Sequence, residues 1–434
     1  MRITTIFNRP PIEFLTVASP KVLAGVCTFG LNLVLMRKLG VAQYGIYALC
    51  STVILLSDTI LGSSLDLAIL RLAPLERERD GSLCLAIQKT GLLIKAGLGM
   101  VFCVAITVCA LLMGLFQEKE AIRLLLATCA AIIALLMLRS AQVNAQVSRR
   151  FYLYGSLDLI QLIVEFGGAA SLILIGRVTL PLLLWLFALG PLSGFLLWRA
   201  TAGREFARAS IGHMRQLALK IWHYGQWFLV TFGLGAVLSR LDIFLLSRWS
   251  SLSEVGIFSA GQVIAWVPVL IGTYLAVVLT PRIMPLTRDG RFNAFYRKFQ
   301  LPLLGICVLG YFVSLAAMPL IGPRLLPKTF MRSMPVISVL LPGALAGLAT
   351  FPLTLSFVMF VRPRFLFFMD CISFPILILL YYYAIPRFGG VGAAWVTSAA
   401  NVTRAFVAQW MAWQWTSEVD VTSSSKNLPL EVLD

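Results

Sequence analysis

The sequence predicts an all-α polytopic membrane protein with about twelve transmembrane helices in two six-helix lobes. Composition, the spacing of apolar runs and an internal repeat each point to this fold class. Of the 434 residues, 59% are hydrophobic and 13% are charged, and the mean hydropathy is +0.88. A soluble fold of that composition would leave much apolar surface in water. The chain is therefore expected to lie in a bilayer.

Apolar runs of helical length recur along the whole chain. A hydrocarbon core about 30 Å thick needs roughly 20 helical residues to cross it. Gly or Pro residues fall at the joints between runs, for example Gly40, Pro74, Gly176 and Pro386. The predicted spans are 17–36, 46–66, 91–116, 122–143, 154–175, 178–198, 224–247, 256–280, 300–321, 334–360, 365–385 and 389–413.

The basic residues between the runs predict the orientation. With a cytoplasmic N-terminus, the inner segments carry about twice as many Lys and Arg residues as the outer loops. Because short cytoplasmic loops are enriched in Lys and Arg, both termini are predicted to be cytoplasmic. Residues 1–16 then form an inner N-terminal segment. The basic stretch 199–223 forms an inner linker, and the polar tail 414–434 is predicted to be disordered.

A repeat offset by 211 residues relates the two halves of the chain. The matching residues are Leu35, Arg37, Gly45 and Ile46 with Leu246, Arg248, Gly256 and Ile257, and Arg71, Pro74 and Leu75 with Arg282, Pro285 and Leu286. Six spans per half give both halves the same orientation, so the pseudo-two-fold axis should follow the membrane normal. A duplicated helix set, here an N-lobe at 17–198 and a C-lobe at 224–413, is typical of a carrier.

Several function classes are disfavoured. The net charge of +17 lies in short segments between spans, which suits anionic lipid headgroups rather than nucleic acid. The sequence has no P-loop motif and no zinc-type Cys/His spacing, so no cofactor or metal is predicted. The predicted outer loops are about a dozen residues or shorter, which leaves little room for the catalytic groups of an enzyme.

Several charged residues fall inside the predicted spans. A charge facing lipid at mid-membrane costs at least ~2.5–3.5 kcal/mol, so the deep ones must face a partner or a polar path. Lys21 and Asp66 lie near span ends and are expected to snorkel. The others are Asp58, Lys95, Arg139, Asp158, Glu165, Arg240, Asp242, Asp370 and Arg404.

Two polar groupings stand out among these spans. Asp158, Gln161 and Glu165 share one helix face, and this stripe either lines a water-filled vestibule or joins helices, the first being favoured. Arg139 with Gln142 and Asn144 forms a second patch. Arg240 and Asp242 are two residues apart on a predicted continuous helix, so they should point to different sides, and one of them should pair across the bundle or form a structural ion pair. Six tryptophans at span ends predict an interfacial belt: Trp198, Trp222, Trp249, Trp410, Trp413 and Trp415.

Residues 35–48 (LMRKLGVAQYGIYA) resemble the first-loop signature of polysaccharide flippases, the Wzx-type O-antigen and exopolysaccharide transporters of the multidrug/oligosaccharidyl-lipid/polysaccharide (MOP) superfamily. Their motif reads Arg-x-Leu-Gly-x-x-x-Tyr/Phe-Gly-x-Tyr. The second half is similar at Asp242 and at residues 254–260 (EVGIFSA), and again at 385–394 (IPRFGGVGAA). The resemblance covers nearly the whole chain.

This resemblance implies a MATE-like, two-lobed fold with a V-shaped central cavity in the cell inner membrane. It implies transport of an undecaprenyl-pyrophosphate-linked oligosaccharide, such as an O-antigen unit for lipopolysaccharide, with membrane lipids and other polysaccharide-assembly membrane proteins as partners. Cations in the cavity would meet the pyrophosphate. The candidates are Arg139, Arg240, Lys95 and Arg404, with Asp158, Gln161, Glu165, Asp242, Asp58 and Asp370 as polar or coupling residues.

Two other readings stay open. A MATE-type cation-coupled multidrug antiporter would need an anionic cavity built on the five carboxylates just named. Six anions against five cations in the predicted spans do not decide between the two carriers, and the motif around Gly45 favours the flippase. A membrane glycan polymerase or transferase is the third reading, and the short outer loops disfavour it.

Overall fold

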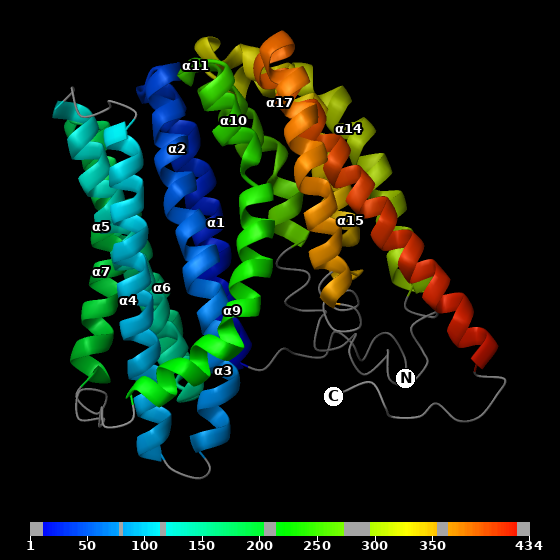
Figure 1. Ribbon diagram of the computed structural model, residues 1–434. Helices are drawn as coiled ribbons and strands as arrows, with labels where there is room; N and C mark the ends of the chain where they lie inside the picture. Colours follow the sequence, from blue (N-terminus) through cyan, green and yellow to red (C-terminus); the bar gives the residue numbers. More distant parts are fainter. Residues whose placement is uncertain are drawn as a thin grey trace. The chain divides into compact units, whose positions relative to one another are not determined.

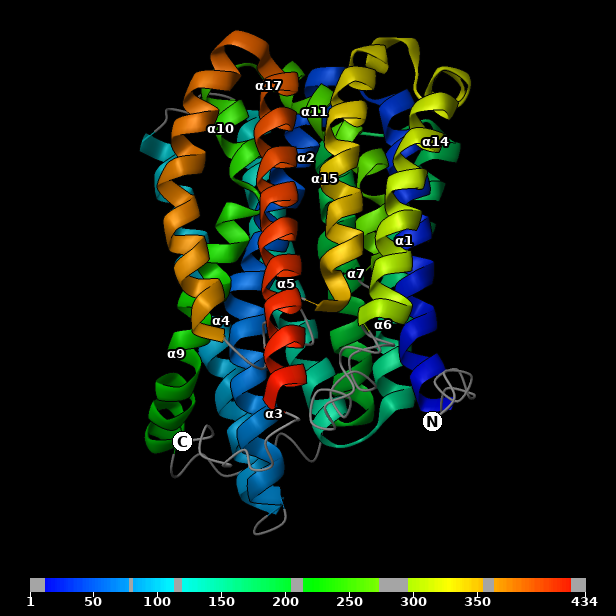
Figure 2. The same ribbon diagram turned by 90° about the vertical axis from the view of Figure 1, so that its right-hand side faces the viewer.

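The computed structural model is helical throughout the part that it describes, residues 12–77, 81–112, 119–203, 214–272, 296–353 and 363–422. No strand occurs in these ranges. Figures 1 and 2 show the long helices that make up this part of the chain. The predicted all-α fold class is confirmed.

The elements follow one another along the chain in this order: α1 (Ile12–Lys38), α2 (Val41–Ser57), the π-helical turn η2 (Asp58–Ser63), α3 (Ser64–Arg77), α4 (Gly81–Leu112), α5 (Lys119–Val147), α6 (Phe151–Ile175), α7 (Leu180–Thr201), α9 (Met214–Leu238), α10 (Leu241–Trp249), α11 (Leu252–Ala265), the π-helical turn η4 (Tyr296–Gln300), α14 (Leu301–Leu325), the 3₁₀ turn η5 (Lys328–Ser333), α15 (Met334–Leu353) and α17 (Pro363–Thr422).

Length and composition identify membrane-crossing helices. Among the described residues, eight helices are long and apolar enough to span a bilayer, or nine if the bent pair α9–α10 is one span. Helix α1 is not among them, but its bounds cover the first predicted span. Large apolar side chains such as Val101 and Val104 on α4, and Phe312 on α14, are about 60% exposed or more, as expected for surfaces that meet lipid. The number twelve stays a prediction, and part of the predicted span 256–280 lies outside the described residues.

Two predicted spans differ from the structure. The span placed at 46–66 is one helical stretch, Val41–Pro74, because α2, η2 and α3 run on without a break in helical structure. The span placed at 224–247 is bent by 50° between α9 and α10. The last two spans form α17, whose helical path breaks at Gly389 (φ 54°, ψ −133°), between 365–385 and 389–413 as predicted.

Contacts within the chain divide it into two compact units. We call them the N-unit, the described residues up to Ser247 together with Ser251–Gly256, and the C-unit, Arg248–Ser250 with the described residues from Ile257 onward. Helix α9 packs against α3 and α4, which places it in the N-unit. The predicted lobes, 17–198 and 224–413, were defined by the sequence repeat, whereas the two units are defined by contacts. The lobes therefore stay a prediction.

The N-unit is a helical bundle in which α5 packs along α7, α7 along α6, and α4 along α3 and α5. One core cluster joins α3, α4, α5 and α9 through buried residues such as Ile69, Ile87 and Ile221. A second joins α2, η2, α5 and α7 through Ile54, Leu61 and others. Small residues of α5, such as Ala131, allow these helices to approach closely, as is usual between membrane helices.

The C-unit is built on α14, α15 and α17. Helix α15 packs along both neighbours, and Cys307, Leu341 and Leu345 lie in the core cluster between α14 and α15. Figure 2 shows the two arms of α17 on either side of Gly389 running in opposite directions. Tyr381 on one arm hydrogen-bonds Thr397 on the other over 2.9 Å. The arms therefore form an antiparallel pair.

The repeated glycines Gly45 and Gly256 meet within the N-unit. A Cβ atom on Gly45 would lie 2.0 Å from the carbonyl oxygen of Leu252, and one on Gly256 would lie 2.1 Å from that of Val41. Val41 and Leu252 are themselves separated by the repeat offset. The two copies of the motif thus contact each other reciprocally, backbone to backbone, where α2 crosses the start of α11.

Candidate functional site

A change from α-helical to π-helical geometry places a carboxylate inside the N-unit. In the stretch 41–74, six residues from Asp58 to Ser63 form the π-helical turn η2. The hydroxyls of Ser57, just before the turn, and Thr59, within it, donate to the carbonyls of Ile54 and Leu55, at 2.7 and 3.0 Å. Side-chain bonds of this kind compete with the main-chain hydrogen bonds of an α-helix. π-helical turns are often found at functional sites.

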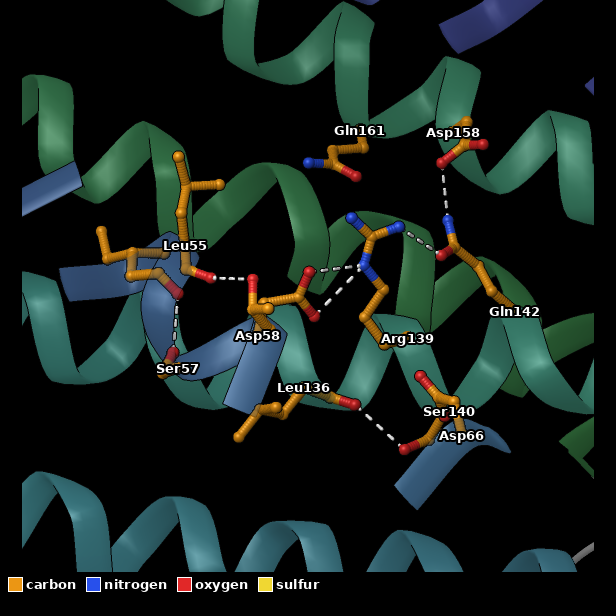
Figure 3. A network of polar contacts seen from close by, with 12 residues as sticks. Leu55, Ser57, Asp58, Asp66, Leu136, Arg139, Ser140, Gln142, Asp158 and Gln161 are labelled. Carbon is orange, nitrogen blue, oxygen red and sulfur yellow. Dashed lines mark hydrogen bonds and ion pairs between the residues drawn. The ribbon is translucent and has the colours of Figure 1, made fainter. Parts of the chain in front are cut away.

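Helix α5 brings Arg139 to this turn. Its Nε donates to both carboxylate oxygens of Asp58, 3.1 Å to Oδ2 and 3.3 Å to Oδ1 (Figure 3). Its Nη1 donates to Oε1 of Gln142, one turn further along the same helix, over 2.9 Å. The ion pair and the amide therefore fix the plane of the guanidinium.

The network continues from α5 to α6. Gln142 Nε2 donates to Oδ1 of Asp158 over 2.6 Å. Also on α6, Gln161 Nε2 donates to Oε1 of Glu165 over 2.9 Å, and Glu165 is buried. Figure 3 shows Asp158 and Gln161 projecting from the same helix toward the Arg139 side of the bundle. The predicted polar face of residues 158, 161 and 165 thus borders the Arg139 group, which we define as Arg139, Asp58, Gln142 and Asp158.

The guanidinium of Arg139 keeps free hydrogen-bonding capacity. Within the described ranges, its hydrogen bonds use Nε and Nη1, and none uses Nη2. The side chain is 33% exposed, whereas that of Asp58 is 13% exposed. An oriented guanidinium with a spare donor edge suits a phosphate or carboxylate, since Arg binds both in a planar, bidentate manner.

Lys95 lies in a different environment. Its ammonium forms an ion pair with Asp66 between α4 and α3, and the side chain is 0% exposed. The prediction that Asp66 snorkels at a span end is wrong, because the helix continues past it to Arg77 and places it beside Lys95. Lys95, a candidate for the pyrophosphate, has its charge neutralised inside the bundle.

The remaining candidates lie elsewhere. Arg404 pairs with Asp370 across the two arms of α17, in the C-unit, and is 38% exposed. Arg240 lies at the bend between α9 and α10, where the helix ends at Leu238. Asp242 is buried at the start of α10 and accepts the backbone N–H of Ile243 over 2.8 Å. Because of this bend, the i, i+2 argument for a continuous helix does not apply to Arg240 and Asp242.

The polar patch predicted on α5 divides into two. Asn144 belongs with Gln88 of α4 and accepts the indole N–H of Trp198 over 3.1 Å, apart from Arg139. Trp198 is 2% exposed, so its predicted place in an interfacial belt is wrong. Trp222, Trp410 and Trp413 are exposed, as that belt requires. Among the described residues, no group of His, Cys, Asp and Glu could hold a metal ion.

Comparison with known proteins identifies the family. The model of the polysaccharide biosynthesis protein family matches residues 18–287, more than half of the chain. The chain belongs to this family. A comparison with curated protein sequences finds no match.

Solved structures of membrane transporters share the fold of this family member. The lipid II flippase MurJ, in an inward closed conformation, matches with a TM-score of 0.69 and 12% identity over 95% of this chain and 93% of that one. An inward-facing multidrug resistance MATE family transporter of the MOP superfamily matches with a TM-score of 0.64 and 13% identity over 94% and 99%. A MOP superfamily transporter from Pyrococcus furiosus, described as having a binding pocket of reverse polarity, gives 0.61 and 11% over 94% and 96%.

These matches establish the class of protein. The chain is a multi-pass membrane protein with the fold of the MOP superfamily, as the sequence predicts. The matched proteins named above are a flippase and transporters, in agreement with the prediction that this chain is not an enzyme. At 11–13% identity the structures identify the fold and leave the substrate to be argued from the site.

Proposed function

We propose that the protein moves an undecaprenyl-pyrophosphate-linked oligosaccharide, an O-antigen or exopolysaccharide repeat unit, from the inner to the outer leaflet of the cytoplasmic membrane. The family supports a role in polysaccharide assembly, and the fold supports a carrier. In this proposal both termini lie in the cytoplasm, and the two predicted lobes alternate access to the two leaflets. Membrane lipids and other membrane proteins of polysaccharide assembly are the expected partners.

The observation that carries this proposal is the spare donor edge of Arg139. A pyrophosphate crossing the bilayer needs fixed positive charge within reach, and Arg139 offers Nη2 from a guanidinium that Asp58 and Gln142 hold in place. Arg404 is the corresponding candidate in the C-unit, with the same partial exposure. We assign Lys95 a structural role, because its side chain is fully buried and its charge is already paired with Asp66.

The energetics suit such a carrier. Each sugar hydroxyl left without a partner in hydrocarbon costs about 1–3 kcal/mol, so the oligosaccharide needs a polar path while its lipid tail stays in the bilayer. The α6 stripe of Asp158, Gln161 and Glu165 offers acceptors and donors for hydroxyls. Moving two negative charges outward also gains about 4–5 kcal/mol from an inside-negative potential near 100 mV.

The test compares two arginines of the same helix. Arg139→Ala is expected to lower delivery of lipid-linked sugar to the outer leaflet by about 10- to 100-fold. Arg123→Ala, at an exposed residue of α5, is expected to leave it unchanged. An impermeant lectin applied to spheroplasts measures outer-leaflet sugar, and membrane extracts measure total lipid-linked sugar. Normal outer-leaflet sugar in Arg139→Ala would contradict the proposal.

A cation-coupled multidrug antiporter is the second candidate. On the Arg139 side of the bundle, the three carboxylates Asp58, Asp158 and Glu165 outnumber the one arginine, which favours binding of a cation. Deletion of the gene separates the two functions. Unaltered surface glycan together with hypersensitivity to cationic drugs would favour the antiporter, whereas inner-leaflet accumulation of lipid-linked sugar would favour the flippase.

A further inference from the structure

Asp58 is the carboxylate that directly contacts Arg139. Both of its oxygens lie within 3.3 Å of Nε, so the ion pair neutralises the arginine inside a membrane-spanning bundle. An unpaired charge at that depth is costly, and an empty carrier needs such a partner. The position that Asp58 takes beside the guanidinium is therefore the kind of position that a phosphate oxygen takes on arginine.

A phosphate arriving at Nη2 would lie within a few ångströms of the Asp58 carboxylate. Two like charges at that range repel strongly in a medium of low dielectric constant. Of the other carboxylates nearby, Asp158 and Glu165 are held by amides, through Gln142 and Gln161, and Asp66 is paired with Lys95. Because they lack a direct bond to the guanidinium in the described structure, Asp58 is the group with which the substrate must compete.

The local backbone provides a way for Asp58 to move. Asp58 begins the π-helical turn η2, and its carboxylate lies over Gly62 of the same turn, where a Cβ atom would be 2.6 Å from Oδ1. A π-helical turn carries an extra residue relative to an α-helix. Conversion of this turn to α-helical geometry would rotate Asp58 about the helix axis and away from Arg139. The empty space at Gly62 accommodates the carboxylate in the present arrangement.

We propose that Asp58 is an internal stand-in for the substrate's phosphate. It holds Arg139 while the carrier is empty, releases it when a polyprenyl pyrophosphate binds, and returns to it when the product leaves. This inference rests on the proposed function and assigns Asp58 the role of a positioning residue. If Asp58 only oriented Arg139, its removal would weaken binding of the pyrophosphate or leave it unchanged. If Asp58 is a stand-in, its removal should strengthen that binding.

Binding to the purified full-length protein distinguishes these two cases. With polyprenyl pyrophosphate as the probe in nanodiscs, Asp58→Asn removes the competing charge and is expected to bind on the order of tenfold more tightly than the wild type, the worth of about one charge-assisted hydrogen bond. Outward delivery of the lipid should slow, because nothing then displaces the phosphate. Glu120→Gln, an exposed carboxylate on α5, is the control and is expected to change neither quantity.

A second variant covers the case in which Asp58→Asn fails to fold. Gly62→Ala keeps both charges and forces the Asp58 carboxylate out of its place, so it too is expected to bind the probe more tightly. Weaker or unchanged binding in the folded variants would overturn the inference, because an orienting or structural carboxylate gives that result. Inorganic pyrophosphate and the neutral polyprenol separate recognition of the phosphate from recognition of the lipid.

The arginine variant separates this inference from the proposed function. If Arg139→Ala loses binding of polyprenyl pyrophosphate but the Asp58 and Gly62 variants do not gain it, the stand-in role alone is rejected. If Arg139→Ala binds the probe as well as the wild type does, both the stand-in role and the proposed phosphate site are rejected. Loss in the first variant and gain in the other two supports both.

Discussion

Arg139 and Lys95 are both cations inside the N-unit and both pair with an aspartate, yet the structure gives them different surroundings. Lys95 is 0% exposed, and its carboxylate partner is 15% exposed. Arg139 is 33% exposed and keeps one terminal nitrogen without a hydrogen bond in the described ranges. The first pair is closed and joins two helices. The second is open on one side, which a binding site requires.

The difference comes from the helices and not from the charges. Lys95 and Asp66 lie between α3 and α4, where Ile69, Ile87 and their neighbours fill the surrounding core. Arg139 faces a π-helical turn and the polar stripe of α6, and its side chain is 33% exposed. Depth in the membrane alone therefore does not identify a binding residue.

The largest effect is expected when the closed ion pair, Lys95 with Asp66, is broken. Lys95→Met leaves Asp66 as a buried, uncompensated carboxylate, which typically costs about 3–5 kcal/mol of folding free energy. We expect a lower melting temperature in detergent and much less protein in the membrane. The double variant Lys95→Met with Asp66→Leu removes both charges and should recover most of that stability. A Lys95→Met protein that is stable but inactive would remove the distinction between the two pairs.

Substitutions at Arg139 test the open ion pair, Arg139 with Asp58. Loss of one charged hydrogen bond to substrate costs about 1.5–3 kcal/mol, so Arg139→Ala should lower transport by about 10- to 100-fold while the protein still reaches the membrane. Arg139→Lys keeps the charge without the planar fork and should retain part of the activity. Transport of lipid-linked sugar per mole of membrane protein is the measurement. Arg139→Ala with Asp58→Asn controls for the unpaired carboxylate.

Arg404 and Asp370 provide an intermediate case in the C-unit. Their exposures, 38% and 13%, resemble those of Arg139 and Asp58. A double-mutant cycle on thermal stability should therefore give a coupling of about 0.5–2 kcal/mol, the usual range for polar contacts between membrane helices. A coupling as large as that expected for Lys95 and Asp66 would place Arg404 among the structural ion pairs.

The smallest effect concerns a residue assigned to the wrong environment by sequence. Trp198→Phe removes the indole N–H that Asn144 accepts but keeps an aromatic ring in the core. We expect a loss of about 1 kcal/mol in unfolding free energy and unchanged transport. Trp413→Phe, at an exposed position, is the matched control and should alter stability less.

The spans were predictable because lipid imposes length and composition on any helix that crosses it. Spacing within one helix was also informative, since Gln142 lies three residues after Arg139 and does bond to it. Partners on other helices were not predictable, because residue spacing within α4 carries no information about Asp66 on α3. Neither the π-helical turn at Asp58 nor the bend after Leu238 contains a Pro to reveal it: the turn has only Gly62, and Ser239 and Arg240 form the bend.

The crossing of Gly45 and Gly256 limits how the N-terminal end of α2 can move. Because the contact joins main chain to main chain, no side chain there can change rotamer to make room. Any separation of α2 from the start of α11 must displace whole helices at once. The two helices are therefore either in contact or apart at this crossing. A methyl group on either glycine should favour the separated state.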